Sequence, residues 1–285
     1  MRLIVETGSF ATEWAMIDQD RVIGTAETEV INPILQSRRE ISRLVRLNLP
    51  SIFFNKKYEK VYYYGVGCGT VERQRIVEAS FVTQFKAPVI VDSSLLAAAR
   101  GMLKKREGIA CVLANNSGSC HYDGHNIVES VVSGGYLLGD EGSATVLGRI
   151  FLADVLKKIA PVELMLDFYN QYNITVPQLH EQVYEKPQPQ PERFLASVAD
   201  FLKNYEEHDY VKKLVRDNFT NFFERCVKQY HYQGLPFYVV GHMAFKFKKD
   251  LFDVAKAYGI RLDSAHIAVT PREGLIKYHQ HNPKV

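Results

Sequence analysis

Three short stretches of this sequence place carboxylates, hydroxyls and glycines at the end of a predicted strand or at the start of a predicted helix. The first is ETGSFATEW, residues 6–14, which follows the apolar run at residues 3–5. Main-chain N–H groups of a Gly-Ser turn can bind an anion, and a carboxylate such as Glu6 can hold a Mg²⁺-bound water molecule. Glycine and serine are also common in turns that bind nothing. The stretch is therefore a candidate phosphate site, with an ordinary turn as the alternative.

The second stretch contains Asp92, at the end of the apolar run 88–91 and directly before a helix of small residues. Sheets of α/β proteins bind ligands at the carboxyl ends of their strands. A carboxylate there could act as general base on a sugar hydroxyl. Asp92 could instead be the N-cap of the helix that follows, and both roles stay open at this point.

The third stretch, GGYLLGDEGSATVLG at residues 134–148, is the most specific. Several glycines, the acidic pair Asp140 and Glu141, and Ser143 before an apolar helix predict a tightly folded loop at a helix start. Asp140 could hydrogen-bond the hydroxyl groups of a ligand, whereas Ser143 could serve only as the helix cap.

The first hundred residues alternate strands and helices, which is typical of an α/β domain. Apolar residues recur with helical spacing in two segments, and the remaining apolar runs have strand composition. The predicted helices are at about 38–49 and 71–85, and the predicted strands at about 2–6, 13–18, 22–29, 61–64 and 88–91.

A second strand-turn-strand unit follows, with a strand at 108–113, a polar turn at 114–118 and a strand that ends at 124. Two such openings predict a duplicated architecture. From about 143 to 230 the apolar residues follow helical spacing, interrupted by a proline-rich connector at 185–193 that cannot continue a helix.

The C-terminal part returns to an α/β pattern. A strand at 237–240 leads into Gly241 and a helix to about residue 258, followed by a short strand at 265–269 and a closing helix from 271. A glycine between a strand and a helix allows close backbone approach. Such a junction often contacts a nucleotide.

Composition excludes several classes of protein. The chain has 285 residues, of which 46% are hydrophobic, and it contains no apolar run of the length that spans a membrane, about 18 residues. It also begins without a signal-peptide pattern, so we expect a soluble cytoplasmic protein with no membrane partner. The net charge is only +3 and the basic residues are scattered, so no nucleic-acid partner is expected. Lys246, Lys248 and Lys249 are interpreted as a solvated helix face.

The cysteines do not form a disulfide framework. Cys68, Cys111, Cys120 and Cys226 include no closely spaced pair, so we expect reduced and mostly buried thiols. The segment 120–125 combines one thiol with two histidines but lacks a second ligand pair, so a hairpin is favoured over a zinc site.

Taken in order, these motifs resemble the N-acetylglucosamine kinase-like branch of the BadF/BadG/BcrA/BcrD ATPase family. The resemblance extends over essentially the whole chain. The segments that carry it are residues 6–14, 31–33, 65–68, 92–93, 108–124, 139–143, 241–242 and 271–279.

This resemblance implies an α/β fold of two ribonuclease H-like domains of the actin/hexokinase/Hsp70 (ASKHA) type, with a ligand cleft between them. The N-terminal domain would span residues 1–105, and the C-terminal domain 106–270 with a helical insertion at about 143–230. The closing helix, 271–285, could pack back on the first domain. The family also suggests a homodimer.

The resemblance further implies an ATP-dependent kinase that phosphorylates N-acetylglucosamine or a related amino sugar, with ATP and Mg²⁺ as cofactors. Asp92 matches the family's catalytic base, and Glu6 would hold Mg²⁺ through water. Contacts to the sugar match Asn32, Asp140 and Ser117. Contacts to the nucleotide and its phosphates match Glu6, Gly8, Ser9, Thr12, Asn115, Asn116, Gly241 and His242.

The sequence departs from the family pattern in both phosphate loops. In the first loop Glu6, Phe10 and Ala11 stand where the family has Asp, Thr and Lys. In the second, residues 114–119 read ANNSGS where the family has GTGSNS, so two glycines that would permit close phosphate approach are lost. His242 replaces a small residue of the adenosine motif. A catalytically impaired sugar-binding or regulatory protein is therefore the alternative function.

Overall fold

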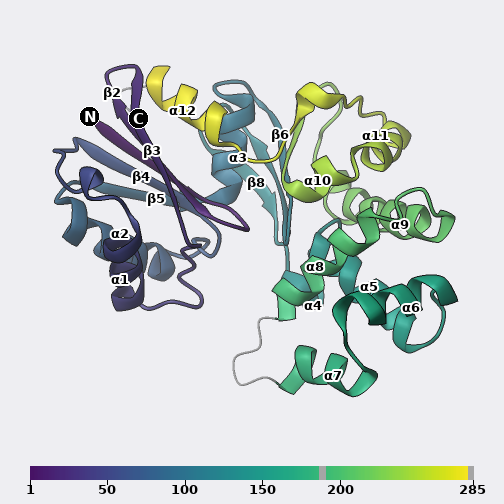
Figure 1. Cartoon of the computed structure of the whole chain (residues 1–285). Coiled ribbons are helices and arrows are strands. Elements are labelled where there is room, and N and C mark those ends of the chain that lie inside the picture. Colours follow the sequence, from purple (N-terminus) through teal and green to yellow (C-terminus); the bar gives the residue numbers. More distant parts are fainter. Residues whose placement is uncertain (186–190, 282–285) are drawn as a thin grey trace. The chain divides into compact units, whose positions relative to one another are not determined.

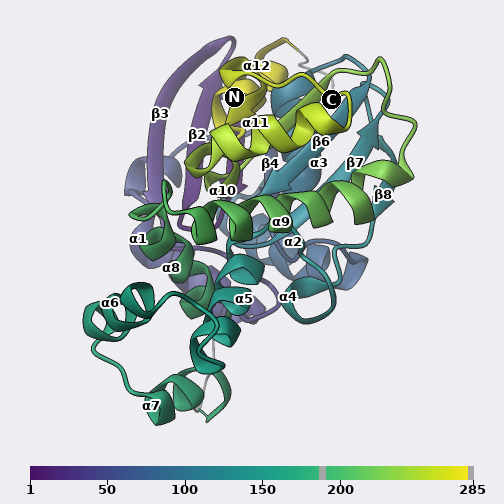
Figure 2. The same ribbon diagram turned by 90° about the vertical axis from the view of Figure 1, so that its right-hand side faces the viewer.

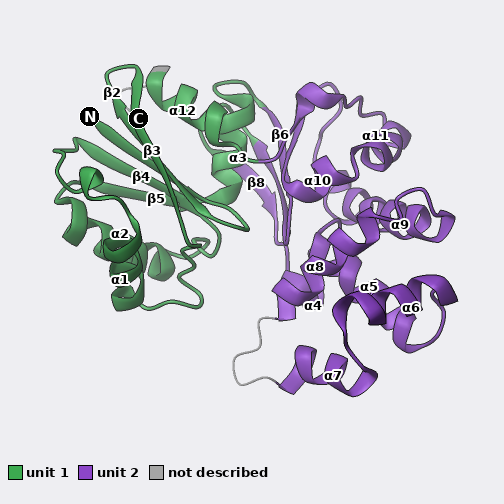
Figure 3. Ribbon diagram, viewed as in Figure 1, with its two compact units in different colours: residues 1–107, 122–127, 270–285 green, residues 108–121, 128–269 purple. Residues whose placement is uncertain are grey.

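A computed structural model describes residues 1–185 and 191–281 of the chain, shown from two sides in Figure 1 and Figure 2. The described chain divides into two compact units (Figure 3). Unit 1 comprises residues 1–107, 122–127 and the C-terminal stretch from 270, and unit 2 comprises residues 108–121 and 128–269.

Unit 1 is built on a five-stranded sheet with the strand order β3-β2-β1-β4-β5. The first three strands are antiparallel neighbours, whereas β1, β4 and β5 are parallel. The strands are β1 (Arg2–Thr7), β2 (Thr12–Asp18), β3 (Arg21–Thr28), β4 (Lys60–Gly65) and β5 (Val89–Ser93), and the helices are α1 (Arg38–Asn48), α2 (Val71–Phe85), α3 (Ser94–Leu103) and α12 (Arg272–His281), with a short 3₁₀ turn at Ser51–Phe53.

Unit 2 repeats this arrangement, since its sheet has the order β10-β9-β6-β7-β8. Each strand of the first sheet thus has a counterpart five strands later, which is the duplication that the two strand-turn-strand units predicted. The strands are β6 (Gly108–Leu113), β7 (Ser117–Tyr122), β8 (Ile127–Val131), β9 (Phe237–Val240) and β10 (Ile267–Ala268).

Helices supply most of the core of unit 2. The aromatic residues of the predicted amphipathic segments, such as Phe151, Phe201 and Phe222, are fully buried. The helices are α4 (Gly135–Leu138), α5 (Ala144–Leu156), α6 (Val162–Tyr172), α7 (Val176–His180), α8 (Pro191–Lys203), α9 (Asp209–Arg225), α10 (His242–Lys246) and α11 (Lys248–Ala257), with a π-helix at Glu181–Glu185 and 3₁₀ turns at Val227–Gln229 and Ser264–His266.

The structure corrects several predicted boundaries. β8 was not predicted, because its sequence has mixed polarity and three of its five residues are exposed. The helix predicted to run to 258 breaks at Phe247 into α10 and α11. The strand predicted at 265–269 is shorter, since only Ile267–Ala268 form β10 and the two residues before them belong to a 3₁₀ turn. Residues 191–193 of the predicted connector belong to α8, since proline is tolerated in a first helical turn. Residue 185 ends the π-helix, and residues 186–190 of the connector lie outside the described residues.

The four cysteines are free and buried, as the sequence analysis predicted. The three lysines near residue 248 do not form an open cationic patch. Lys246 pairs with Asp200, Lys249 lies 3.7 Å from Glu207, and the ammonium of Lys248 lies over the Phe245 ring.

Helix α12 packs on α3 within unit 1, although about 170 residues separate them in the sequence. Two glycines meet at this crossing. A Cβ atom built on Gly274 would lie 1.9 Å from the carbonyl oxygen of Gly101, and one built on Gly101 would lie 2.7 Å from that of Pro271. The two backbones therefore approach more closely than any side chain allows.

This contact predicts whether a substitution at Gly274 raises or lowers the stability of the protein. Ala is normally preferred over Gly inside a helix by up to about 1 kcal/mol. We expect Gly274→Ala instead to lower the free energy of unfolding by about 1–3 kcal/mol, because the new methyl group would push α12 off α3. Urea denaturation measures the difference. Gly69→Ala is the matched control, since a Cβ there has no neighbour within 4 Å; greater stability of Gly274→Ala would contradict the crossing.

Candidate functional site

The first predicted phosphate loop is the turn between β1 and β2. Thr7 and Thr12 face each other as the last paired residues, and the N–H of Gly8 donates to the carbonyl of Ala11 over 3.0 Å, which closes the turn. The side chain of Phe10, at the tip, is 69% exposed. The turn thus presents a large apolar ring where the family motif has a hydroxyl.

The hydroxyl of Thr12 is not available to a ligand in this structure. It is fully buried, lies 3.0 Å from the hydroxyl of Thr7, and accepts the N–H of Ile31 over 3.1 Å. Its observed contacts therefore hold the segment beside Asn32, a predicted sugar residue. Ser9, the remaining hydroxyl residue of this turn, follows Gly8 at the tip.

Glu6 lies in a buried carboxylate pair. It is the cross-strand partner of Glu13, and Glu13 forms an ion pair of 3.2 Å with Arg272 of α12. All three line a cavity of only about 10 Å³. Burial, and to a lesser extent the charge of Glu13, raises the pKa of Glu6 to about 8, while Arg272 opposes this shift. At neutral pH the Glu6 carboxyl is therefore mostly protonated.

A protonated carboxyl is a poor partner for a metal-bound water molecule. Among residues 1–185 and 191–281, no group of three or more His, Cys, Asp or Glu side chains is arranged to hold a metal ion. As it stands, Glu6 does not fit the role that the resemblance implies for it.

Asp92 ends β5 and is not the helix cap. The cap of α3 is Ser93, whose side chain accepts the N–H of Leu96 over 3.2 Å, so the alternative role considered for Asp92 is wrong. Asp92 instead pairs with Arg100, two turns along α3, with 3.3 Å between Oδ2 and Nη1. Burial raises the pKa of Asp92 above its ordinary value, and the Arg100 guanidinium opposes this.

A hydrogen-bonded network continues behind Arg100. Its guanidinium donates to the hydroxyl of Tyr64 over 2.8 Å, and that hydroxyl lies 2.9 Å from Nε2 of His279 on α12. His279 is fully buried, and burial lowers its pKa to about 3, so the ring is neutral. Because a neutral Nε2 can accept, Tyr64 can donate to His279 while it accepts from Arg100. The orientation of Asp92 thus depends on α12.

Asn32 lies at the same edge of the unit 1 sheet as Asp92. Its Oδ1 accepts the N–H of Ile34 over 3.0 Å, and a Cβ atom built on Gly67, which has a φ of +78°, would lie 2.8 Å from that oxygen. Cys68 follows Gly67. Burial, and to a lesser extent the nearby Asp92 carboxylate, raises the pKa of the Cys68 thiol to about 12. The loop after β4 therefore connects the two predicted sites.

The second predicted phosphate loop is the turn between β6 and β7. The N–H groups of Ala144 and Thr145, at the start of α5, donate to the carbonyls of Ala114 and Asn115 over 2.9 and 3.3 Å. Free N–H groups at a helix start can bind an anion. Here these two groups hold the turn instead. Asn116 closes the turn, since its carbonyl accepts the N–H of Ala114 over 2.9 Å.

The predicted adenosine motif lies against this turn. A Cβ built on Gly241, whose φ is +131°, would be 2.1 Å from the carbonyl oxygen of Leu113, so only glycine fits at this strand end. Burial lowers the pKa of His242 to about 4, and Nε2 of this neutral ring lies 2.9 Å from Oδ1 of Asn115. The structure thus joins two motifs that are more than a hundred residues apart.

Asp140 and Ser117 also come together. The N–H of Ser117 donates to Oδ1 of Asp140 over 3.4 Å, and Asp140 is 4% exposed. Burial is the main cause that raises the Asp140 pKa to about 6. Its φ of +56° is in the left-handed region, which is uncommon for a residue other than glycine and is a mark of functional sites. Ser143 caps α5, as predicted, by accepting the N–H of Val146.

The comparisons with solved structures agree with these motifs. The "Putative N-acetylglucosamine Kinase" of Porphyromonas gingivalis is 35% identical in sequence, with a TM-score of 0.92, over 99% of this chain and 100% of that chain. This chain belongs to the N-acetylglucosamine kinase-like family. Neither the family models nor the curated proteins yielded a match.

More distant structures show the fold of this N-acetylglucosamine kinase-like protein. The "Putative N-acetylglucosamine Kinase" of Chromobacterium violaceum is 15% identical, with a TM-score of 0.71 over 97% of this chain and 98% of that chain. A ROK family glucokinase from Streptomyces griseus, in complex with glucose and AMPPNP, is 13% identical, with a TM-score of 0.56 over 97% of each chain. The predicted class, two α/β domains of the actin/hexokinase/Hsp70 type, is confirmed. No described helix of this family member is both long and apolar enough to cross a membrane.

Asn218, on α9, is a functional-site residue of this kinase-like chain that was not predicted from the sequence. Its Oδ1 accepts the N–H of Gly142 over 2.8 Å, and its Nδ2 donates to the carbonyl of Ser143 over 3.0 Å. Asn218 is 1% exposed and therefore fixes the loop that carries Asp140. The available signal was a polar residue at a core position of an apolar helical stripe, between Val215 and Phe219. Arg100, Tyr64 and His279 were missed as well.

Glu6 predicts a pH dependence of stability. An unfolded glutamate titrates near 4.5, and the folded one near 8, so the folded protein binds the extra proton between these values. Stability therefore falls as pH rises through this interval, by at most about 5 kcal/mol. We expect Glu6→Gln to be more stable than wild type at pH 8 and equal to it near pH 4.5. Denaturation midpoints at both pH values measure this, with exposed Glu29→Gln as control; a benefit confined to low pH would contradict the buried pair.

Asn218 predicts a local loss of stability. Asn218→Ala leaves the buried N–H of Gly142 without its partner, at a cost of about 1–3 kcal/mol, whereas the carbonyl of Ser143 still accepts the N–H of Leu147 over 3.1 Å. Hydrogen exchange at Gly142 should accelerate together with a lower midpoint of unfolding. The exposed Asn221 on the same helix supplies the control, Asn221→Ala. Unchanged exchange at Gly142 would show that the loop does not depend on Asn218.

Proposed function

We propose that this protein is an ATP-dependent kinase that phosphorylates a hydroxyl group of an amino sugar, N-acetylglucosamine or a close relative. The observation that carries the proposal is the identity of 35% over the whole chain with a protein named for that activity. The sugar kinases with lower identity support only the fold. A glucokinase of this fold was solved with glucose and AMPPNP, which is consistent with a nucleotide as the phosphate donor.

Asp92 is the proposed general base. It would accept the proton of the attacking sugar hydroxyl as the new O–P bond forms and the bond from the terminal phosphorus to the leaving oxygen of ADP breaks. A carboxylate that burial pushes toward a higher pKa is a stronger base than an exposed one. Arg100 would hold the orientation of Asp92 and keep it ionised.

Asn32, Asp140 and Ser117 are the proposed sugar contacts. Asn32 shares the sheet edge with Asp92 in unit 1, whereas Asp140 and Ser117 are adjacent in unit 2. The nucleotide is proposed to contact the turn at Gly8 and Ser9, the turn at Asn115 and Asn116, and the junction at Gly241 and His242. Mg²⁺ would reach Glu6 through water only if the positive charge of the ion lowered the pKa of that carboxyl, because bound phosphates alone would raise it.

A second candidate is a sugar-binding or regulatory protein with impaired catalysis. The contacts of both loops favour it. Glu6 is protonated beside Glu13, and the first N–H groups of α5 bond the 114–116 turn instead of facing solvent. Phosphoryl transfer depends on positioning and electrostatic stabilisation by such groups, so their diversion would reduce the rate.

Calorimetry and an ADP-release assay separate the two candidates. The kinase proposal expects Mg-ATP binding in the micromolar to low millimolar range, typical of enzymes, and ADP release that depends on N-acetylglucosamine. Binding of the sugar with no binding of Mg-ATP at about 5 mM would reject the kinase and support the second candidate. If neither ligand binds, both candidates fail.

The proposed role of Asp92 as general base predicts a kinetic effect of its substitution. Asp92→Asn should lower kcat by about 10²–10⁴-fold because the amide cannot accept the proton, with the KM for the sugar changed by less than about threefold. In the wild type, kcat should fall as pH drops through the raised pKa of Asp92. Steady-state assays of Asp92→Asn beside Asp20→Asn, an exposed turn residue, measure this. Full activity of Asp92→Asn would remove Asp92 from the mechanism.

A further inference from the structure

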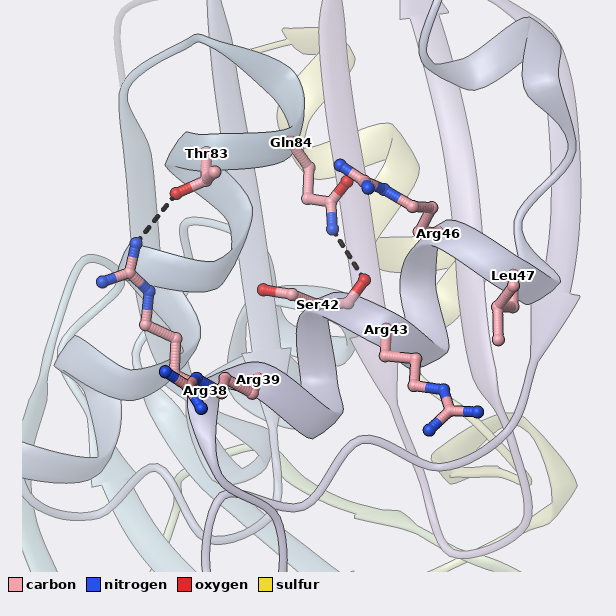
Figure 4. A pocket seen from close by; sticks show the side chains of 8 residues that line it. All are labelled: Arg38, Arg39, Ser42, Arg43, Arg46, Leu47, Thr83 and Gln84. Carbon is pink, nitrogen blue, oxygen red and sulfur yellow. Dashed lines mark hydrogen bonds between the residues drawn. The ribbon is translucent and has the colours of Figure 1, made fainter.

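Helix α1 forms one wall of an arginine-lined groove on unit 1 (Figure 4). The groove has a volume of about 620 Å³, and a neighbouring hollow of about 390 Å³ shares Arg46, Thr83 and Gln84 with it and adds Lys86. None of the residues that line either hollow is acidic. We call the first hollow the arginine groove; it is lined by Arg38, Arg39, Ser42, Arg43, Arg46, Leu47, Thr83 and Gln84.

The walls of the arginine groove are held by hydrogen bonds between α1 and α2. Arg38 donates to the hydroxyl of Thr83 over 3.1 Å, and Gln84 donates to the carbonyl of Ser42 over 2.7 Å, as the dashed lines in Figure 4 mark. The buried side of α1 packs Ile41 and Val45 into the core. The arginine side is therefore fixed in direction by both the core and α2.

The arginines reduce the stability of their own helix. Arg39 and Arg43 are four residues apart and Arg43 and Arg46 three apart, and such like-charged neighbours repel each other on a helix. Arg38 and Arg39 also occupy the first turn, where the helix dipole disfavours cations, whereas it favours Arg46 in the last turn.

No ion pair offsets this repulsion. Glu40, the single acidic residue of α1, is engaged with Ser37 in the capping box. Within the described ranges, no carboxylate pairs with Arg39, Arg43 or Arg46. A local rule that is broken without compensation is a mark of a functional surface.

We propose that the arginine groove binds an acidic segment of a partner protein. Guanidinium groups bind carboxylates with two parallel hydrogen bonds, and these groups extend over about 12 Å of helix, the length of a short peptide segment. Leu47 lies at the same surface and is 68% exposed, which offers an apolar contact to such a segment. None of the residues that line this surface is among the proposed kinase contacts.

Other occupants fit less well. A small anion would stay largely in water, because all four arginines are exposed, whereas ligand pockets usually bury about 70–90% of the ligand. Nucleic-acid surfaces carry broader basic patches, with a domain pI above about 9, and this chain has a pI of about 8.5.

Fluorescence anisotropy with the full chain tests the proposal. The probe is a labelled helical peptide of about 14 residues with glutamates at i, i+4 spacing and one leucine, and its control has glutamine in place of every glutamate. We expect the acidic probe alone to bind, and about 0.5 M NaCl to weaken the binding strongly. Arg43→Glu/Arg46→Glu should weaken it about tenfold or more. The same reversal at the exposed Arg21 and Arg75 should have little effect.

Stability gives a second, independent readout. Arg43→Gln should raise the melting temperature, because it removes like-charge repulsion. A lower melting temperature would overturn the proposal, since Arg43 would then stabilise the fold instead of being kept for a partner. The proposal would be overturned if the acidic probe did not bind, if the glutamine control bound equally well, or if the Arg21/Arg75 variant lost as much binding. It would also be overturned if single-stranded RNA or tripolyphosphate bound more strongly than the probe.

Discussion

The guanidinium of Arg100 is the group on which the candidate site in unit 1 depends. Arg100 is 8% exposed, and a charge with so little contact to solvent must be paired. Asp92 supplies the opposite charge, Tyr64 accepts a hydrogen bond, and the Tyr278 ring of α12 lies 5.4 Å below it. The candidate base, the sheet and the closing helix are therefore stabilised together.

Unit 2 is constrained more by backbone contact than by charge. Gly241 approaches the carbonyl of Leu113 so closely that no side chain fits, and Gly139 approaches the carbonyl of Ser133 in the same way. Asp140 takes a left-handed conformation next to Gly139. Asn218 then fixes the end of this loop through two buried hydrogen bonds. The candidate sugar-binding carboxyl is thus oriented by groups that would never contact a sugar.

The two predicted phosphate turns show how much a motif match leaves for the tertiary structure to decide. Both turns stand at the expected strand ends, yet their polar groups have internal partners. The hydroxyl of Thr12 accepts the N–H of Ile31. The side chain of Asn115 is hydrogen-bonded to His242, and its carbonyl accepts an N–H at the start of α5. A nucleotide would have to compete with these hydrogen bonds, whereas Asp92 is still 27% exposed along its side chain.

The sequence by itself determined the class of fold, the duplication, the helical region and the cysteine state, because these follow from periodicity, turn chemistry and composition that act over a few residues. It also located Asp92 and Gly241 at strand ends and Asp140 in the loop before a helix, whereas Asn32 was assigned through the family resemblance. Only the tertiary structure decided that Ser93 rather than Asp92 caps α3, that Glu6 titrates beside Glu13 and Arg272, and that Asn218 holds the Asp140 loop. The physical reason is that a pKa or a buried hydrogen bond depends on groups distant in the sequence, which no local pattern records.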